Sequence, residues 1–287
     1  MSNRRRGVLL IVGAALLWST GGIGIKALPE APLTVTFYRS LVASIALLLL
    51  YRGSLWRRRQ WRFSPAFVVA LISYAACLTT FVTATKWTTA ANAIFIQYAG
   101  VIWVMLFAPL VVGEVLRRID VIAVAAALSG MGLFFVGRFE MRGMAGNGMA
   151  VLFGIFFAAL LLSLRREHAS SEAAITFGNL LTAAVLLPFV ASTLRISPRS
   201  MAILLFLGVF QIAFAYLLFV KGLAHVTAVE ASLTGMIEPI ANPLWVFLIV
   251  GERPSNFALA GGAIVLAAIG WHAVKSGRSG HELPAPD

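Results

Sequence analysis

The sequence is poor in charge, cysteine and histidine. Only 12% of its 287 residues are charged, 60% are hydrophobic, and the mean hydropathy is +0.90. A single cysteine, Cys77, excludes an internal disulfide and a thiolate metal cluster. The four histidines lack the spacing of metal ligands, so we expect no metal and no cofactor. This composition excludes an ordinary soluble domain.

Apolar runs of about 20 residues, enough to cross roughly 30 Å of hydrocarbon, recur along the whole chain. They predict an all-α membrane protein. We expect ten transmembrane helices, at residues 7–25, 33–51, 65–85, 90–112, 119–137, 146–164, 172–193, 199–220, 228–250 and 255–274. The turns around Lys86 and Lys221 are short and could instead be kinks, so nine or eleven helices are the alternatives.

Loop charges predict the orientation in the membrane. Most of the 23 Lys and Arg residues lie on one side if both termini are cytoplasmic, as the positive-inside rule requires. The runs RRR (4–6) and RRRQWR (57–62) then serve as topology anchors that meet membrane lipids. We therefore expect lipids, and not nucleic acid, as partners of these runs, and a monomer or weak homodimer. The first apolar run is longer than a usual signal-peptide core, which favours an uncleaved helix.

The two halves of the chain resemble each other. Residues 89–132 align with 227–270 at a constant offset of 138, and Val-Gly-Glu at 112–114 recurs at 250–252. We expect two five-helix repeats, at 1–142 and 143–275, followed by a cytoplasmic polar tail at 276–287. Five helices per repeat invert the second repeat in the membrane. Inverted repeats are typical of secondary transporters, whose substrate sites lie near the midplane and open to each side in turn.

Four segments resemble one family over nearly the whole chain. They are ALLWSTGGIGIKAL (15–28), FYRSLVASIALLLL (37–50), APLVVGEVLRRIDVIAVAAALSGMGL (108–133) and EPIANPLWVFLIVGERPSNFALAGGAIVLAAIG (238–270). They are similar to the drug/metabolite transporter superfamily, EamA-type, and most similar there to bacterial aromatic amino acid exporters of the YddG type. The resemblance implies a ten-helix exporter or permease for small metabolites in the bacterial inner (plasma) membrane. Its matching positions, at least partly architectural, are Trp18, Glu114, Glu238, Pro239 and Glu252.

The stretch MIEPIANPLW (236–245) places a carboxyl group and two prolines inside an apolar run. Pro239 and Pro243 each remove a backbone donor and predict a bend, and polar backbone at that depth must face protein or water. A charge at Glu238 costs at least about 2.5 kcal/mol there. Glu238 could bind a substrate ammonium or carry a proton, or it could satisfy the backbone that Pro239 opens.

Other polar residues have two interpretations each. Arg39, about two turns into the second expected helix, either reaches the outer surface or binds a substrate carboxylate in bidentate fashion. Glu114 and Glu252 end corresponding helices and are predicted as helix-end contacts or gates. TAVE at 227–230 has the pattern of a capping box, in which Glu230 reaches back to the amide of Thr227.

Deep aromatic and amide side chains complete the candidate binding site. Flat apolar walls with a few hydrogen-bonding groups are the composition of a small-molecule pocket, although helix packing is the alternative for each one. The candidate substrate-binding residues are Trp18, Arg39, Tyr74, Asn92, Gln97, Tyr98, Trp103, Gln211, Tyr216 and Glu238.

These observations favour a secondary transporter that exports amino acids, aromatic or other neutral ones, by alternating access. A broad metabolite or toxic-cation permease of the same superfamily is the alternative. An intramembrane enzyme or lipid-handling protein is a remote one, because no nucleophile, base and orienting group recur on one helix face. We therefore do not expect an enzyme.

Overall fold

The structure, a computed structural model, describes residues 2–57, 63–137, 143–241, 245 and 255–278. The described residues are helical or lie in turns and loops, with no strand among them. The α-helices are α1 (Asn3–Trp18), α2 (Gly21–Lys26), α3 (Pro32–Arg57), α4 (Pro65–Trp87), α5 (Ala90–Tyr98), α6 (Gly100–Val111), α7 (Arg118–Phe134), α8 (Met144–Arg166), α9 (Ser171–Val190), α10 (Pro198–Phe206), α11 (Ala215–Leu223), α12 (Ala228–Gly235) and α14 (Asn256–Arg278).

Helix starts follow local sequence signals. Ser64 accepts a hydrogen bond from the Phe67 amide at the start of α4, and Pro65 occupies the first helical position, where its missing donor has no consequence. Ser197 and Pro198 repeat this arrangement at the start of α10. The helix ends are therefore set by short sequence patterns that lie between the apolar runs.

Eight helical segments within the described residues are long and apolar enough to cross a membrane. They correspond to eight of the ten expected spans. Of the other two, α7 has 17 residues, and the ninth span is described only from α12 to residue 241 and at Trp245. Separate helices flank the turns after Lys86 and Lys221, namely α4 and α5, and α11 and α12, so these segments are not single kinked helices.

Several expected spans are interrupted, which the apolar pattern did not predict. The first is broken between α1 and α2 at Ser19, and the fourth between α5 and α6 at Ala99. The eighth contains a π-helical segment, Leu207–Phe214, between α10 and α11. In the ninth, α12 ends at Gly235 and residues 237–241 are helical again. This break precedes Pro239, which lies in the first turn of the new helix, where proline is tolerated; Pro243 lies outside the described residues.

The fourth span breaks at Ala99 and the ninth at Met236. The offset of 138 pairs position 99 with position 237, so the two breaks lie within one residue of corresponding positions. Only the second has a proline close by. Both halves are therefore interrupted at this point, with or without a proline.

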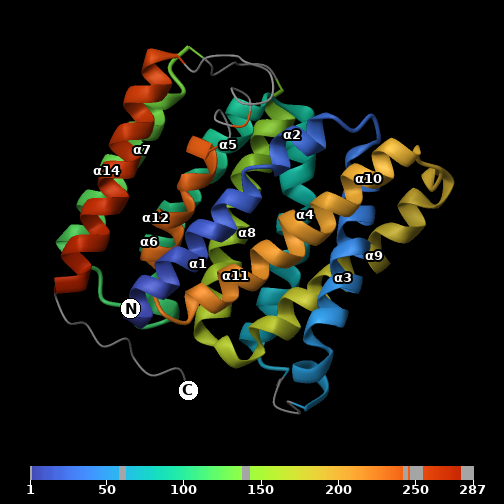
Figure 1. The fold of residues 1–287 in the computed structure, drawn as a ribbon, viewed down its shortest axis with the longest axis horizontal. Coiled ribbons are helices and arrows are strands. Elements are labelled where there is room, and N and C mark those ends of the chain that lie inside the picture. The colour runs from blue at the N-terminus through green and yellow to red at the C-terminus, as the bar shows by residue number, and fades with distance from the viewer. Residues whose placement is uncertain (1, 58–62, 138–142, 242–244, 246–254, 279–287) are drawn as a thin grey trace.

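Helix pairing has the same symmetry. α1 packs against α11 while α4 packs against α8, and exchanging the halves converts one pair into the other. The pairs α3–α9, α6–α12 and α7–α14 each join one helix to its counterpart. Figure 1 shows α7 and α14 side by side at one edge of the bundle, α3 and α9 toward the other, and α1, α8 and α11 between them.

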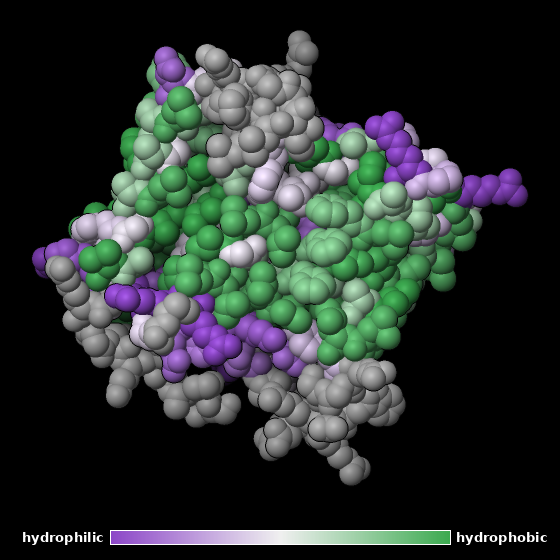
Figure 2. All heavy atoms as spheres, in the orientation of Figure 1, coloured by the Kyte–Doolittle hydropathy of each residue, from purple (hydrophilic) through white to green (hydrophobic). Residues whose placement is uncertain are grey.

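Polar and apolar side chains separate on the surface. On the face in Figure 2, apolar residues cover the middle, and hydrophilic residues gather along the lower edge and at the upper right. Leu49, Leu110 and Phe189 are each about two-thirds exposed or more. Exposure of such large apolar side chains is unfavourable in water but not in lipid. Where helices touch, glycine permits close approach: a Cβ on Gly261 would lie 2.5 Å from the Gly130 carbonyl oxygen.

Candidate functional site

A cavity of about 60 Å³ lies between the helices, lined from both halves of the chain. A site for one water needs about 10–15 Å³, so this cavity admits several waters or a compact solute. Seven of the ten predicted substrate-binding residues line it: Trp18, Arg39, Gln97, Tyr98, Gln211, Tyr216 and Glu238. Most of the polar side chains that line the cavity were therefore among the residues predicted from the sequence.

Arg39 is the most deeply buried cation of the site. Only 2% of it is exposed, which excludes the interpretation that it reaches the outer surface. Its Nη2 donates a hydrogen bond to Gln211 Oε1, and its guanidinium lies 5.8 Å from the ring centre of Phe81. No other described residue offers a partner to its Nε and Nη1. The guanidinium is thus buried with two donor atoms unsatisfied among the described residues.

Gln97 supplies a second unsatisfied group. Its Oε1 is buried and has no hydrogen-bond partner among the described residues, although the side chain lines the cavity. Buried polar atoms usually have a partner, and the free oxygen of Gln97 and the free donors of Arg39 are exceptions that both lie at this cavity.

Glu238 is tied to Tyr98. The Tyr98 hydroxyl lies 2.6 Å from Glu238 Oε2 and 2.9 Å from the Gly235 carbonyl oxygen. Its single hydrogen can serve only one of these acceptors. An ionised Glu238 accepts the hydrogen bond from the Tyr98 hydroxyl. A protonated Glu238 instead donates a hydrogen bond to the Tyr98 oxygen, and the hydroxyl then donates to the Gly235 carbonyl. The Tyr98 hydroxyl thus contacts residues on both sides of the break after α12. This contact is compatible with either protonation state of the Glu238 carboxyl.

Aromatic rings form the walls. Trp18 meets Tyr216 and Phe219 with ring centroids 5.1 Å away in each case, and Phe157 at 6.2 Å. Tyr74 stands behind this wall: its ring packs edge-on against Tyr216 at 4.7 Å, and Asn179 donates a 2.9 Å hydrogen bond to its hydroxyl. Tyr74 thus holds the wall in place from outside the lining.

Two predicted residues lie elsewhere. Asn92 sits at one end of the bundle, and Trp103 lines a separate lateral groove between α4, α6 and α8. Several lining residues were not predicted from the sequence, because single phenylalanines in apolar runs look like ordinary packing. The missed residues include Cys77, Phe81, Phe153, Phe157, Phe219 and Ser232. The spacing of Phe153 and Phe157, one helical turn apart, was the only available signal.

Hydrogen bonds join the two halves at the end of the bundle where α2 finishes, which we call the Lys26 end. Asn147, in the first turn of α8, accepts hydrogen bonds from Asn92 (3.1 Å) and Thr88 (2.7 Å). Lys26 Nζ donates to the Thr88 carbonyl at 2.9 Å, and Lys86 Nζ donates to that of Leu28. Asn92 therefore belongs to a contact between the halves and not to the cavity lining.

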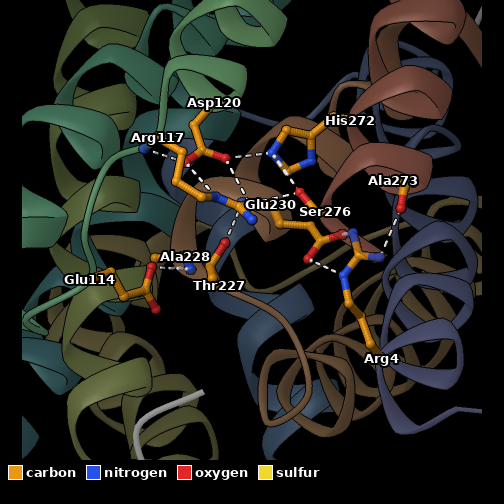
Figure 3. Close-up of polar contacts among 10 residues, drawn as sticks. All are labelled: Arg4, Glu114, Arg117, Asp120, Thr227, Ala228, Glu230, His272, Ala273 and Ser276. Atoms are coloured by element: carbon orange, nitrogen blue, oxygen red, sulfur yellow. Dashed lines mark hydrogen bonds and ion pairs between the residues drawn. The ribbon is translucent and has the colours of Figure 1, made fainter. Parts of the chain in front are cut away.

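Charged groups join the two halves at the opposite end, where α1 begins and which we call the Arg4 end (Figure 3). Arg4 Nε donates to Glu230 Oε2 at 3.1 Å, and Arg4 Nη1 donates to the Ala273 carbonyl at 2.8 Å. Thr227 caps α12 by accepting from the Glu230 amide, as predicted. The Glu230 carboxylate, expected to reach back to Thr227, binds Arg4 instead.

Glu114 joins three elements at the Arg4 end. Its carboxylate accepts a 3.0 Å hydrogen bond from Arg165 at the end of α8 and a 2.8 Å one from the Ala228 amide at the start of α12. The partner of Glu114 is thus Arg165, and not Arg117 or Arg118, which are nearer to it in the sequence. Burial raises the pKa of Glu114 above its ordinary value, and the hydrogen bond from Arg165 opposes that shift. Its counterpart Glu252 lies outside the described residues.

A neighbouring network ties α7 to α14 (Figure 3). Asp120 accepts from the Arg117 amide at 2.8 Å and lies 2.6 Å from His272 Nε2, while Arg117 Nη2 donates to Ser276 at 2.6 Å. No group of three or more metal-ligating side chains occurs among the described residues. This network fastens two helices and does not contribute to the cavity.

Comparisons with known proteins agree over nearly the whole chain. The model of the EamA-like transporter family matches residues 5–136 and 144–272. An uncharacterized transporter of Archaeoglobus fulgidus is 24% identical over 91% of this chain and 95% of its own length. The uncharacterized transporter YwfM of Bacillus subtilis is 28% identical over 91% of each chain.

A protein of known crystal structure has the same fold, with a TM-score of 0.81 at 18% identity over 96% of this chain and 99% of the other. The names of the two relatives state no substrate, so the narrower likeness to aromatic amino acid exporters rests on this sequence alone. Two family matches, one in each half and together spanning most of the residues, are decisive. The chain belongs to the EamA-like transporter family.

Proposed function

We propose that the protein exports neutral amino acids, aromatic ones in particular, across the bacterial inner membrane. One observation carries the proposal: Arg39 and Glu238 line the same aromatic-walled cavity. A free amino acid presents a carboxylate and an ammonium, and these two side chains offer one partner to each. The rings of Trp18, Tyr216 and Phe219 provide an apolar wall for its side chain.

Binding of both charges explains why each protein group can be buried. Arg39 alone would be an unpaired cation in the membrane, which is costly, and a substrate carboxylate would pair with it through one edge of the guanidinium. Glu238 would accept from the ammonium while Tyr98 turns its hydrogen to Gly235. A solute with only one of the charges would leave the other protein group unpaired, so the site would select zwitterions.

Alternating access between two inverted halves would move the substrate. We propose ten transmembrane helices, repeats at 1–142 and 143–275, a polar tail at 276–287 and cytoplasmic termini. Three observations support this arrangement: the interchangeable helix pairs, the matching breaks at Ala99 and Met236, and the contact of Arg4 with Ala273, which places the described ends of the chain together.

The polar contacts at the two ends would act as the gates. The offset of 138 pairs Asn92 with Glu230, so each half contributes one polar residue to a gate, bound by the first turn of α8 or of α1. The gate at the Lys26 end uses neutral amides, and that at the Arg4 end uses an ion pair. Exit would require the Asn92–Asn147 contact to open while Arg4–Glu230 holds.

A broad metabolite or toxic-cation permease is the second candidate. Aromatic rings around a carboxylate suit an organic cation, and the cavity has both. Arg39 argues against it, because a buried guanidinium repels a cation that carries no carboxylate.

Counterflow in liposomes containing the purified protein tests the proposal. Vesicles are loaded with phenylalanine, threonine, a sugar phosphate or methyl viologen, and entry of labelled phenylalanine is followed. Neutral amino acids alone should drive entry, with phenylalanine ahead of threonine. Exchange driven equally by methyl viologen would favour the permease, and no exchange with any solute would end the amino acid proposal.

A further inference from the structure

A second hollow lies on the side of the bundle, between α4, α6 and α8. It has a volume of about 1030 Å³, and we call it the lateral groove. Its apolar wall includes Trp103 and Phe107, whose rings stack with centroids 6.3 Å apart, and Ile155 on α8. These three side chains are 38–45% exposed. The groove is therefore separate from the central cavity and opens sideways, where a transporter meets lipid.

The length of the groove along α8 matches the thickness of the hydrocarbon layer of one lipid leaflet. Along α8 it extends from Arg166 at the Arg4 end to Ile155, eleven residues or about 16 Å of helix. Half of a hydrocarbon core of about 30 Å is roughly 15 Å. The apolar wall would thus run from the headgroup level to the bilayer centre, which suits an acyl chain and not a small polar solute.

The rim of the groove carries both signs of charge. Arg166 forms no hydrogen bond or ion pair with any other described residue and is exposed. Glu167 follows it and accepts a hydrogen bond from Ser64 Oγ, which fixes the carboxylate at the start of α4. Ser170 lines the same rim. The neighbouring Arg165 is already paired with Glu114, so a single cation remains available here among the described residues of the groove.

We propose that the lateral groove binds a phospholipid with an amine headgroup, of the phosphatidylethanolamine type. Arg166 binds the phosphate, Glu167 binds the ammonium, and an acyl chain lies along Phe107, Trp103 and Ile155. The adjacent opposite charges favour a zwitterionic headgroup with hydrogen-bond donors over phosphatidylglycerol, which has no ammonium. They also favour it over phosphatidylcholine, whose methylated amine donates no hydrogen bond.

Native mass spectrometry of the purified protein with an equimolar mixture of the three lipids tests this site. We expect phosphatidylethanolamine to be retained preferentially. Arg166→Gln should lower its retention by about tenfold, because a charge-assisted contact to phosphate is lost. Glu167→Gln should remove only the preference over phosphatidylglycerol. Arg118→Gln, an exposed arginine at the same end but outside the groove, serves as the matched control and should change nothing.

Trp103→Ala tests the apolar wall, and should weaken retention of all three lipids while the headgroup order is kept. A thermal unfolding temperature equal to wild type shows that each variant folds. Equal retention of the three lipids by the wild-type protein would overturn the proposal, as would unchanged lipid retention in Arg166→Gln. Cross-linking of residue 103 to the same residue in a second copy would show that the groove is a dimer contact instead.

Discussion

Thr89 and Thr227 start α5 and α12 in the same way, each accepting a 3.1 Å hydrogen bond from the amide three residues later. Those amides belong to Asn92 and Glu230, whose side chains join the two halves at opposite ends of the bundle. A repeated cap thus positions both proposed gates. The chemistry differs, since one gate uses uncharged amides and the other an ion pair, so the two should respond differently to salt and to mutation.

Arg39→Gln should reduce phenylalanine counterflow by at least about tenfold, because a charge-assisted hydrogen bond is worth about 1.5–3 kcal/mol. The protein should be as stable as wild type or more so, since the change removes buried donors that lack partners. Counterflow and thermal unfolding in detergent measure the two effects. Arg39→Lys, which keeps the charge and loses the planar fork, should rescue transport only in part. Full activity of Arg39→Gln would show that Arg39 does not bind the substrate.

Tyr98→Phe tests the contact at the break after α12. The variant leaves Glu238 and the Gly235 carbonyl without the shared hydroxyl, so we expect weaker transport with a smaller loss than in Glu238→Gln, which removes the charge that would bind the ammonium. Counterflow of labelled phenylalanine compares the two variants. If Glu238→Gln transports as well as wild type while Tyr98→Phe does not, the carboxyl has a structural role at the bend.

Opening the Arg4 end should expose the cavity from that side. Cys77 is the only cysteine, is 1% exposed and lines the central cavity, so it reports access without an introduced cysteine. Arg4→Gln breaks the ion pair with Glu230 and should speed modification of Cys77 by a membrane-impermeant thiol reagent added on that side. Mass spectrometry of the labelled protein measures the rate.

Asn92→Ala provides the mirror experiment, because it weakens the closure at the Lys26 end. It should raise Cys77 modification from the opposite side only. Cys77→Ser gives the background. Equal acceleration from both sides in either variant would indicate general loosening of the bundle and would contradict the gate assignment.

Gly261→Ala should destabilise the contact between α7 and α14. The new Cβ would lie 2.5 Å from the Gly130 carbonyl oxygen, and overpacking of this kind costs about 1–3 kcal/mol. Gly132→Ala is the matched control, because a Cβ at that position would have no neighbouring atom within 4 Å, and alanine favours a helix over glycine by about 0.5–1 kcal/mol. Thermal unfolding should separate the pair, and equal melting temperatures would show that this contact is not tight.

The spans and much of the cavity could be predicted from the sequence for physical reasons. Hydrocarbon thickness fixes the length of an apolar run, so eight expected spans recur as helices of membrane-crossing length. A polar residue in such a run is costly enough to need a purpose, which is why Arg39, Gln211 and Glu238 were found. Aromatic residues carry a weaker signal, and Trp103 shows the consequence: its position in a run does not reveal which side of the helix it faces.

Contacts between distant segments could not be predicted. Glu230 has the spacing of a capping box, yet Arg4 lies closer to its carboxylate in the folded chain. His272 carries no signal near the end of its apolar run, yet it is buried beside Asp120, 152 residues away. The breaks at Ser19 and Ala99 have no proline in their place; glycine follows each of them, at Gly21 and Gly100, and is a weaker signal than proline.

The most direct test of zwitterion recognition is counterflow of labelled phenylalanine driven by three internal solutes: phenylalanine, phenethylamine, which lacks the carboxylate, and 3-phenylpropionate, which lacks the ammonium. The three share the aromatic ring, so the comparison isolates the two charges that Arg39 and Glu238 would bind. The account predicts that phenylalanine alone drives entry. Exchange driven equally well by either analogue would show that one charged group suffices, and would contradict the claim that the cavity is built for a free amino acid.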